Sequence, residues 1–135
     1  MEKRFLVAVY GSLMQGLHNH TYLEDSKLKG TFVTEPIYTL IDLGSYPGLY
    51  ENGTTSINME VYEVDEHTLA DIDSLEGYIE DNEELSMYIR KTIDTPFGKA
   101  FGYIYNDPIG TNEPITSGDW KEHITFKHSL AHNDC

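Results

Sequence analysis

The feature that most constrains the fold is an apolar run near the N-terminus, residues 4–10, that ends directly in Gly11 and Ser12. A continuous apolar run of this length predicts a strand that is buried on both faces. The run is too short for a membrane span, and Gly11 follows too soon for the core and cleavage site of a signal peptide. We therefore expect this segment to form a central strand of a sheet.

Most of the remaining chain also reads as short strands separated by Gly and Pro turn signals. The predicted strands are residues 4–10, 29–33, 37–42, 56–64, 85–93 and 99–105. We expect turns at residues 46–50 and 95–98, and a tight hairpin at Asn52-Gly53. Together with two or three short helices, these strands predict a small α+β domain with a mixed, curled or barrel-like sheet.

A chain of 135 residues can bury one core, and its 39% hydrophobic content is ordinary for a single globular domain. We expect that domain to occupy residues 1–121 and a C-terminal tail to occupy residues 122–135. Near the boundary, Asp119 and Glu122 have the spacing of a capping box, which predicts a last helix.

Charge and cysteine content narrow the partners and the compartment. The formal charge is −14, which disfavours binding to a nucleic-acid backbone or an anionic membrane. The one cysteine, Cys135, is the last residue, so no internal disulfide can form. A reducing, cytoplasmic location suits that composition.

Residues 65–77 predict a short helix that carries an acidic residue on its apolar side. Asp65 can cap its start and Gly77 can end it. At about 100° per residue, Leu69 and Ile72 lie on one stripe with Leu75, and Glu76 falls between Leu69 and Ile72 on that face. Glu76 is thus expected to point into the protein.

An inward-facing carboxyl in the last turn of a helix is an unfavourable place for negative charge. Burial and the partial negative end of the helix both disfavour its ionised form, so the pKa of Glu76 should rise toward neutrality. Such a group can accept and donate a proton at cellular pH. The alternative is a solvated acid, one of 23 in the chain, on a slightly rotated helix.

The junction after the first strand is the second candidate site. Gly11-Ser12 at the end of a strand exposes successive backbone N–H groups, and Ser12 adds a hydroxyl donor. Such a nest suits a carboxylate or an oxyanion. Taken alone, a plain turn after a core strand explains it as well, and the Gly-Lys pair of a phosphate-binding loop does not follow.

Taken together, five short motifs in order resemble the gamma-glutamylcyclotransferase-like superfamily, and Asn19-His20 is most similar to its gamma-glutamylamine cyclotransferase branch. The resemblance spans residues 5–120. The matching segments are Val9-Tyr10-Gly11-Ser12-Leu13 with Gly16 and Asn19-His20, Tyr46-Pro47-Gly48-Leu49, Asp73-Ser74-Leu75-Glu76-Gly77-Tyr78, the pair of late segments containing Tyr88-x-Arg90 and Gly102-Tyr103-x-Tyr105, and Ser117-Gly118-Asp119-Trp120.

The resemblance implies an acyltransferase or lyase of this fold that acts on γ-glutamyl amides. In that reaction the free α-amine attacks the γ-carbonyl, closes 5-oxoproline and releases an amine, without a cofactor. It implies Glu76 as the general acid and base. It also implies a substrate site made by Tyr10, Gly11, Ser12, Leu13, Gly48 and Tyr105, with the α-carboxylate held by the loop. Tyr105 serves equally well as a core tyrosine.

Several alternatives stay open at this level. The chain departs from the family pattern at Gln15, at Ile72 and in the acidic loop 80–84, and these departures bear on the identity of the leaving amine. The sequence also leaves the oligomeric state open. Two rival functions stay open. One is a non-catalytic protein that binds a small metabolite as a sensor, and the other is an acidic interaction module that binds a basic partner. Ser12 as a nucleophile would need His20 as its base. The histidine pairs His18/His20 and His128/His132 are expected to be solvated, and no metal site is expected.

Overall fold

The apolar N-terminal segment forms the middle strand of a sheet, as expected. The computed structural model describes residues 3–108 and 110–133. Its elements are β1 (Arg4–Val9), a 3₁₀ turn η1 (His20–Leu23), β2 (Lys27–Val33), β3 (Tyr38–Asp42), β4 (Pro47–Thr55), β5 (Asn58–Asp65), α1 (Glu66–Glu76), a 3₁₀ turn η2 (Glu83–Leu85), β6 (Tyr88–Thr95), β7 (Gly98–Tyr105) and α2 (Trp120–Asn133).

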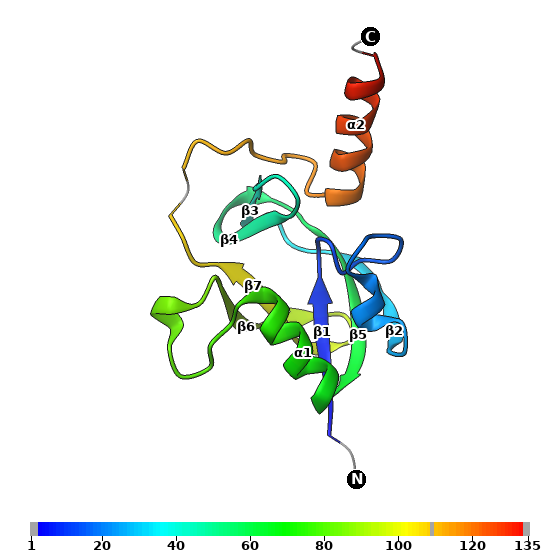
Figure 1. The fold of residues 1–135 in the computed structure, drawn as a ribbon, viewed down its shortest axis with the longest axis vertical. Helices are drawn as coiled ribbons and strands as arrows, with labels where there is room; N and C mark the ends of the chain where they lie inside the picture. The colour runs from blue at the N-terminus through cyan, green and yellow to red at the C-terminus, as the bar shows by residue number, and fades with distance from the viewer. Residues whose placement is uncertain (1–2, 109, 134–135) are drawn as a thin grey trace.

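Five of the strands form one mixed sheet in the order β2-β5-β1-β7-β6. β1 runs antiparallel to β5 and parallel to β7, so the sheet is built around the first strand of the chain. The core-facing part of β1, Val7 to Val9, is buried. β3 and β4 pair separately in a two-stranded sheet that lies toward the end of the molecule from which α2 projects (Figure 1). The α+β prediction is confirmed.

The large sheet is curled but does not close into a barrel. β2 and β6 are its two edges among the residues that the structure describes. The turn between β6 and β7 nevertheless reaches β2, because the Phe97 ring packs on Gly30 so closely that a Cβ there would collide with it. Gly30 lies at a register shift of β2 and has a φ of +153°, which other residues rarely adopt. The contact between the Phe97 ring and Gly30 thus joins the two edges of the sheet, which no strand pairing joins within the described residues.

The helix predicted from residues 65–77 forms with the expected ends. Asp65 accepts a hydrogen bond from the backbone N–H of Thr68 at 2.7 Å, and Gly77 ends α1 in the left-handed conformation with a φ of 69°. Leu69 and Ile72 are buried against the sheet, and α1 lies across one face of it (Figure 1). This fixes which side of the helix Glu76 occupies.

Two turn predictions between residues 46 and 53 are wrong. β4 begins at Pro47 and runs through Asn52-Gly53, while the reversal after β3 occurs earlier, where the Leu43 N–H donates to the Tyr46 carbonyl at 3.0 Å. The Asn-Gly pair instead lies where the register of β3 and β4 shifts. There the Thr39 hydroxyl binds the Asn52 carbonyl at 2.7 Å, which holds the extra residues as a bulge rather than a hairpin end.

The last helix begins where the capping signal placed it. The Asp119 carboxylate accepts the backbone N–H of Glu122 at 3.1 Å, and Trp120 is buried at the start of α2. The expected limit between a domain ending at 121 and a tail from 122 therefore falls inside α2. The first turns of that helix belong to the packed body, and the division itself stays a prediction.

Candidate active site

Most of the predicted site residues meet in one cavity at the end of β1. Glu76 from the end of α1 faces the four residues 10–13 that follow β1. Three tyrosines complete the wall: Tyr46 from the β3–β4 turn, Tyr88 from β6 and Tyr103 from β7. The cavity thus collects side chains from both sheets and from α1.

The Glu76 carboxylate oxygens are open to a ligand in the cavity. It lines the cavity, and no hydrogen bond within the described part of the chain reaches its carboxylate. Burial, and secondarily the negative charge of nearby Asp73, raise the pKa of Glu76 from 4.5 to about 7. The direction predicted from the helix pattern is confirmed. A carboxyl of this pKa is populated in both protonation states at neutral pH.

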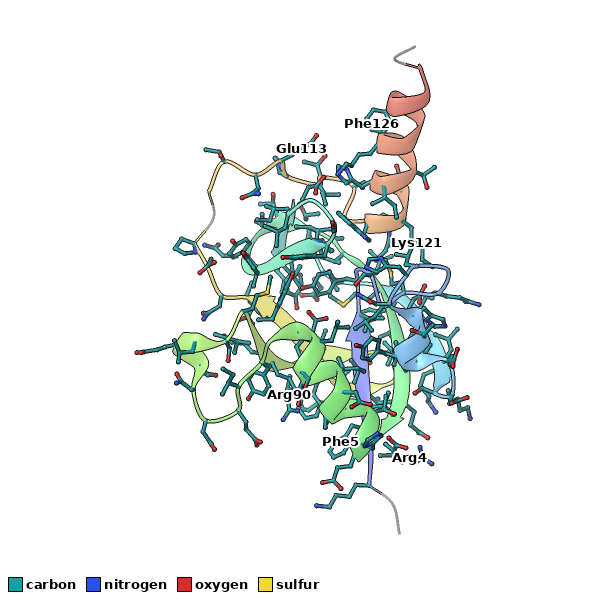
Figure 2. The ribbon with its side chains drawn as sticks, viewed as in Figure 1. Arg4, Phe5, Arg90, Glu113, Lys121 and Phe126 are labelled. Atoms are coloured by element: carbon teal, nitrogen blue, oxygen red, sulfur yellow. The ribbon has the colours of Figure 1, made fainter. Side chains whose placement is uncertain are left out.

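Asp73, one turn before Glu76 in α1, fixes the part of the cavity wall that lies next to Glu76. Its two carboxylate oxygens accept hydrogen bonds at 2.6 Å from the Tyr103 hydroxyl and from the Arg90 guanidinium. Arg90 lies below α1 (Figure 2) and stacks over the Phe101 ring, 4.4 Å from its centroid. This network fixes the Tyr103 ring on the cavity wall and keeps a negative charge close to Glu76.

The loop that follows β1 presents donors to the same cavity. Within the described residues, the backbone N–H groups of Gly11, Ser12 and Leu13 have no hydrogen-bond partner. The Ser12 hydroxyl accepts a hydrogen bond from the Asn19 side chain at 2.8 Å, so its own hydrogen remains available to donate. These groups form a nest for an anion of the size of a carboxylate.

The Asn19-His20 pair stabilises this loop rather than activating Ser12. Asn19 binds Ser12 through both its backbone and its side chain. His20 places Nδ1 3.0 Å from the Leu13 carbonyl oxygen and packs on the Tyr62 ring. The hydrogen-bond partner of the Ser12 hydroxyl is an amide that cannot accept its proton as a base, which speaks against Ser12 as a nucleophile.

Gly11 is required by a close approach between two walls of the cavity. A Cβ at this position would lie 2.8 Å from Cδ of Pro47, which is inside contact distance. The Tyr10 hydroxyl, in turn, donates to the Tyr103 carbonyl at 2.6 Å. The loop is therefore locked against the β3–β4 turn on one side and against β7 on the other.

The two other predicted binding residues, Gly48 and Tyr105, lie behind the residues that line the cavity. A Cβ at Gly48 would be 3.2 Å from Cβ of Tyr105, so these residues pack on each other. The Tyr105 ring contacts the Tyr88 ring, with centroids 5.2 Å apart, and Tyr88 is the one that lines the cavity. A direct role for Gly48 and Tyr105 in binding stays a prediction.

Three tyrosines that line the cavity are not among the site residues predicted from the sequence. Tyr46, Tyr88 and Tyr103 all stand in the motifs that carried the family resemblance, but nothing in a strand pattern says which of ten tyrosines face a cavity. Tyr88 donates its hydroxyl to the Pro47 carbonyl at 2.6 Å, and burial raises its pKa well above the usual range. It therefore acts as a neutral, fixed wall.

A second buried carboxylate ties the loop to α2. Glu60 accepts hydrogen bonds from the Gln15 backbone N–H at 2.8 Å, from the Tyr62 hydroxyl at 2.8 Å and from the Lys121 ammonium at 2.7 Å. Burial acts to raise the pKa of Glu60, but these three donors outweigh it and hold the pKa below its usual value. Figure 2 shows Lys121 at the foot of α2.

Metal-ligating side chains gather at a different place from the histidine pairs considered in the sequence. Asp42, Glu113 and His123 bring one ligand atom each within 4.8 Å of one another. However, His123 and the Lys127 ammonium both lie 2.8 Å from the same Asp42 oxygen, so that carboxylate is already neutralised. The side chains of His128 and His132 lie outside the described residues.

None of the helices in the described ranges is both long and apolar enough to cross a membrane.

Comparison with known proteins agrees with the geometry. The sequence profile of the family described as gamma-glutamyl cyclotransferase, AIG2-like, matches residues 7–122. A Vibrio cholerae protein that is provisionally named a gamma-glutamylcyclotransferase is 50% identical over 119 residues, which cover 88% of this chain and 97% of that one. A Niallia circulans protein named gamma-L-glutamyl-butirosin B gamma-glutamyl cyclotransferase is 33% identical over 85% of this chain and 74% of its own length.

A solved structure shares the fold of this chain. The crystal structure of an uncharacterized protein from Pyrococcus horikoshii superposes with a TM-score of 0.75 at 33% identity, covering 95% of this chain and 98% of that one. The profile match includes the loop after β1, Glu76 and the cavity tyrosines. The chain therefore belongs to the gamma-glutamyl cyclotransferase, AIG2-like, family.

Proposed function

We propose that the protein is an active γ-glutamyl cyclotransferase that converts a γ-glutamyl amide into 5-oxoproline and a free amine. The observation that carries the proposal is Glu76, a carboxyl with a pKa of about 7. It shares a cavity with backbone N–H groups that have no partner in the part of the chain that the structure describes. Family membership supports the reaction class, and the Niallia circulans relative is named for such a reaction on γ-L-glutamyl-butirosin B.

The reaction is an intramolecular aminolysis in which Glu76 relays protons from the attacking nitrogen to the leaving one. Its carboxylate takes a proton from the substrate α-ammonium, and the amine nitrogen then forms a bond to the γ-carbonyl carbon. The bond between that carbon and the leaving nitrogen breaks as Glu76 returns this proton to the leaving nitrogen. The attacking nitrogen gives up its second proton as the lactam forms, and the released amine takes that proton and leaves as an ammonium. A single group of pKa near neutrality can serve both steps because neither protonation state is strongly favoured.

The loop after β1 supplies orientation. We assign the substrate α-carboxylate to the N–H groups of Ser12 and Leu13 and to the Ser12 hydroxyl, which the Asn19 amide leaves free to donate. Holding the carboxylate there fixes the α-amine of the same substrate relative to Glu76. Because nucleophile and electrophile are already in one molecule, such positioning accounts for much of the catalysis without a cofactor.

The test is release of 5-oxoproline from a panel of γ-glutamyl amides, combined with Glu76→Gln. The amide keeps the size of the side chain but cannot carry the proton, so we expect turnover to fall by at least about 10²-fold. Glu66→Gln, an exposed position in the first turn of the same helix, is the matched control and should keep full activity.

Two results would overturn the proposal. One is a Glu76→Gln enzyme that retains most of its turnover. The other is a wild-type protein that binds γ-glutamyl amides, seen as thermal stabilisation, but forms 5-oxoproline from none of them. That second result would favour the non-catalytic sensor on the same fold. We place the reaction in the cytoplasm, as the cysteine content suggests.

A further inference from the structure

A groove next to the catalytic cavity has no role in the proposed chemistry of the γ-glutamyl half. It lies between the loop after β1, the β3–β4 turn and α2, and its volume is about 320 Å³. Ser12 lines both this groove and the catalytic cavity, so the two spaces are adjacent. A substrate whose carboxylate sits at Ser12 therefore has this groove beside it.

The groove has a chemistry of its own. Leu17, Trp120 and Ile124 give it an apolar wall. His18 and Lys127 give it basic groups, and no acidic residue is among the described residues that line it. This is unusual in a chain with 23 acidic and 9 basic residues, because most surfaces of such a protein carry carboxylates.

The Lys127 ammonium can offer N–H donors to a ligand in this groove. Its ammonium donates to the Asp42 carboxylate at 2.8 Å, which anchors the side chain at one end of the groove. An ammonium has three N–H donors, and within the described residues Asp42 is the partner of one of them, which leaves two for a ligand. The Lys127 side chain is 41% exposed, which makes these donors accessible from the solvent side of the groove.

We propose that this groove receives the leaving amine, and that it selects amines with an apolar body and a carboxylate, such as the amino acid or short peptide of a γ-glutamyl peptide. The apolar body lies on Leu17 and Ile124, and the carboxylate binds Lys127. A cationic leaving group, such as a polyamine or the side chain of lysine, would meet Lys127 instead and be disfavoured. The proposal rests on the cyclotransferase activity proposed above.

Three substrates whose leaving amines each carry an aliphatic chain of about four or five carbons separate these features. They are γ-glutamyl-leucine, γ-glutamyl-isopentylamine, which lacks the carboxylate, and γ-glutamyl-cadaverine, which ends in a cation. We expect kcat/KM to decrease in that order. Lys127→Met should raise KM for γ-glutamyl-leucine about tenfold, the effect of losing one hydrogen bond to a charged group, and leave KM for γ-glutamyl-isopentylamine unchanged.

Two variants serve as matched controls. Lys91→Met also removes an exposed lysine from a surface ion pair, with Glu51 at 2.7 Å, but does so away from the groove. Phe126→Ala changes an exposed apolar residue of α2, labelled in Figure 2, and can be compared with Ile124→Ala. We expect only Ile124→Ala to reduce the preference for γ-glutamyl-leucine over γ-glutamyl-glycine.

The outcomes distinguish the two proposals. If all three substrates yield 5-oxoproline with similar kcat/KM, or if γ-glutamyl-cadaverine is the best, the groove assignment is wrong and the cyclotransferase activity stands. The same holds if Lys127→Met changes KM equally for γ-glutamyl-leucine and γ-glutamyl-isopentylamine. If these three fail while another γ-glutamyl amide of the panel yields 5-oxoproline, only the groove assignment is overturned. If no γ-glutamyl amide of the panel yields 5-oxoproline, both proposals are overturned.

Discussion

The raised pKa of Glu76 predicts a stability difference that depends on pH. Burial raises this pKa from 4.5 to about 7. At about 1.4 kcal/mol for each unit of pKa, ionisation of Glu76 lowers the free energy of unfolding by about 3–4 kcal/mol relative to the protonated side chain. Glu76→Gln removes the ionisation and keeps the shape. Its free energy of unfolding should therefore exceed that of the wild type at high pH.

The sign follows from which state loses its proton first. Below a pH of about 4.5, Glu76 is protonated in both states, and the two proteins should have similar stability. Between about 4.5 and 7 the unfolded chain ionises before the folded protein does, so the wild type loses stability relative to Glu76→Gln. Above a pH of about 7 the difference should level off at about 3–4 kcal/mol.

Urea denaturation at pH 4, 5, 6, 7 and 8 measures this difference directly. All other titrating groups are common to both proteins, so their contributions largely cancel in the comparison. Glu66→Gln is the control that removes an exposed carboxylate from the same helix. A gap between wild type and Glu76→Gln that is constant from pH 4 to 8 would show that Glu76 is not held in an environment that disfavours its charge.

Three further predictions concern the surroundings of Glu76. Asp73→Asn removes a negative charge that raises the pKa of Glu76, so the acidic limb of the pH profile of kcat/KM should move to lower pH; an unmoved limb would contradict this. Ser12→Ala removes a donor to the substrate carboxylate and should weaken binding by about 1–3 kcal/mol, measured as a higher KM with normal folding. Gly11→Val forces a side chain onto Pro47, so activity should be lost while circular dichroism remains that of a folded protein; normal turnover would remove the loop from the mechanism.

What could be predicted from the sequence was set by local chemistry. The ends of α1 depend on Asp65 and Gly77, which act within a few residues, and the inward side of Glu76 follows from the spacing of Leu69 and Ile72. The position of β1 at the centre of the sheet follows from its apolar composition. These features need no knowledge of distant parts of the chain.

What could not be predicted depends on contacts between distant segments. Asn52-Gly53 has the composition of a hairpin turn, but pairing with β3 extends β4 through it. The Tyr103 hydroxyl finds its partner in Asp73, thirty positions earlier, so its place on the cavity wall depends on how α1 packs over the sheet. The groove lined by Lys127 exists because α2 packs beside the loop after β1. No local sequence pattern predicts that packing.

The parallel pairing of β1 with β7 has a consequence for how the protein is made. Val7 pairs with Phe101, so one edge of the first strand has to wait until β7, the last of the described strands, is synthesised. At about 5–20 residues per second, a ribosome needs on the order of 5–20 s to add the chain between them. During that time an apolar strand has an open edge, which is the state in which a nascent chain is most exposed to aggregation and to capture by chaperones.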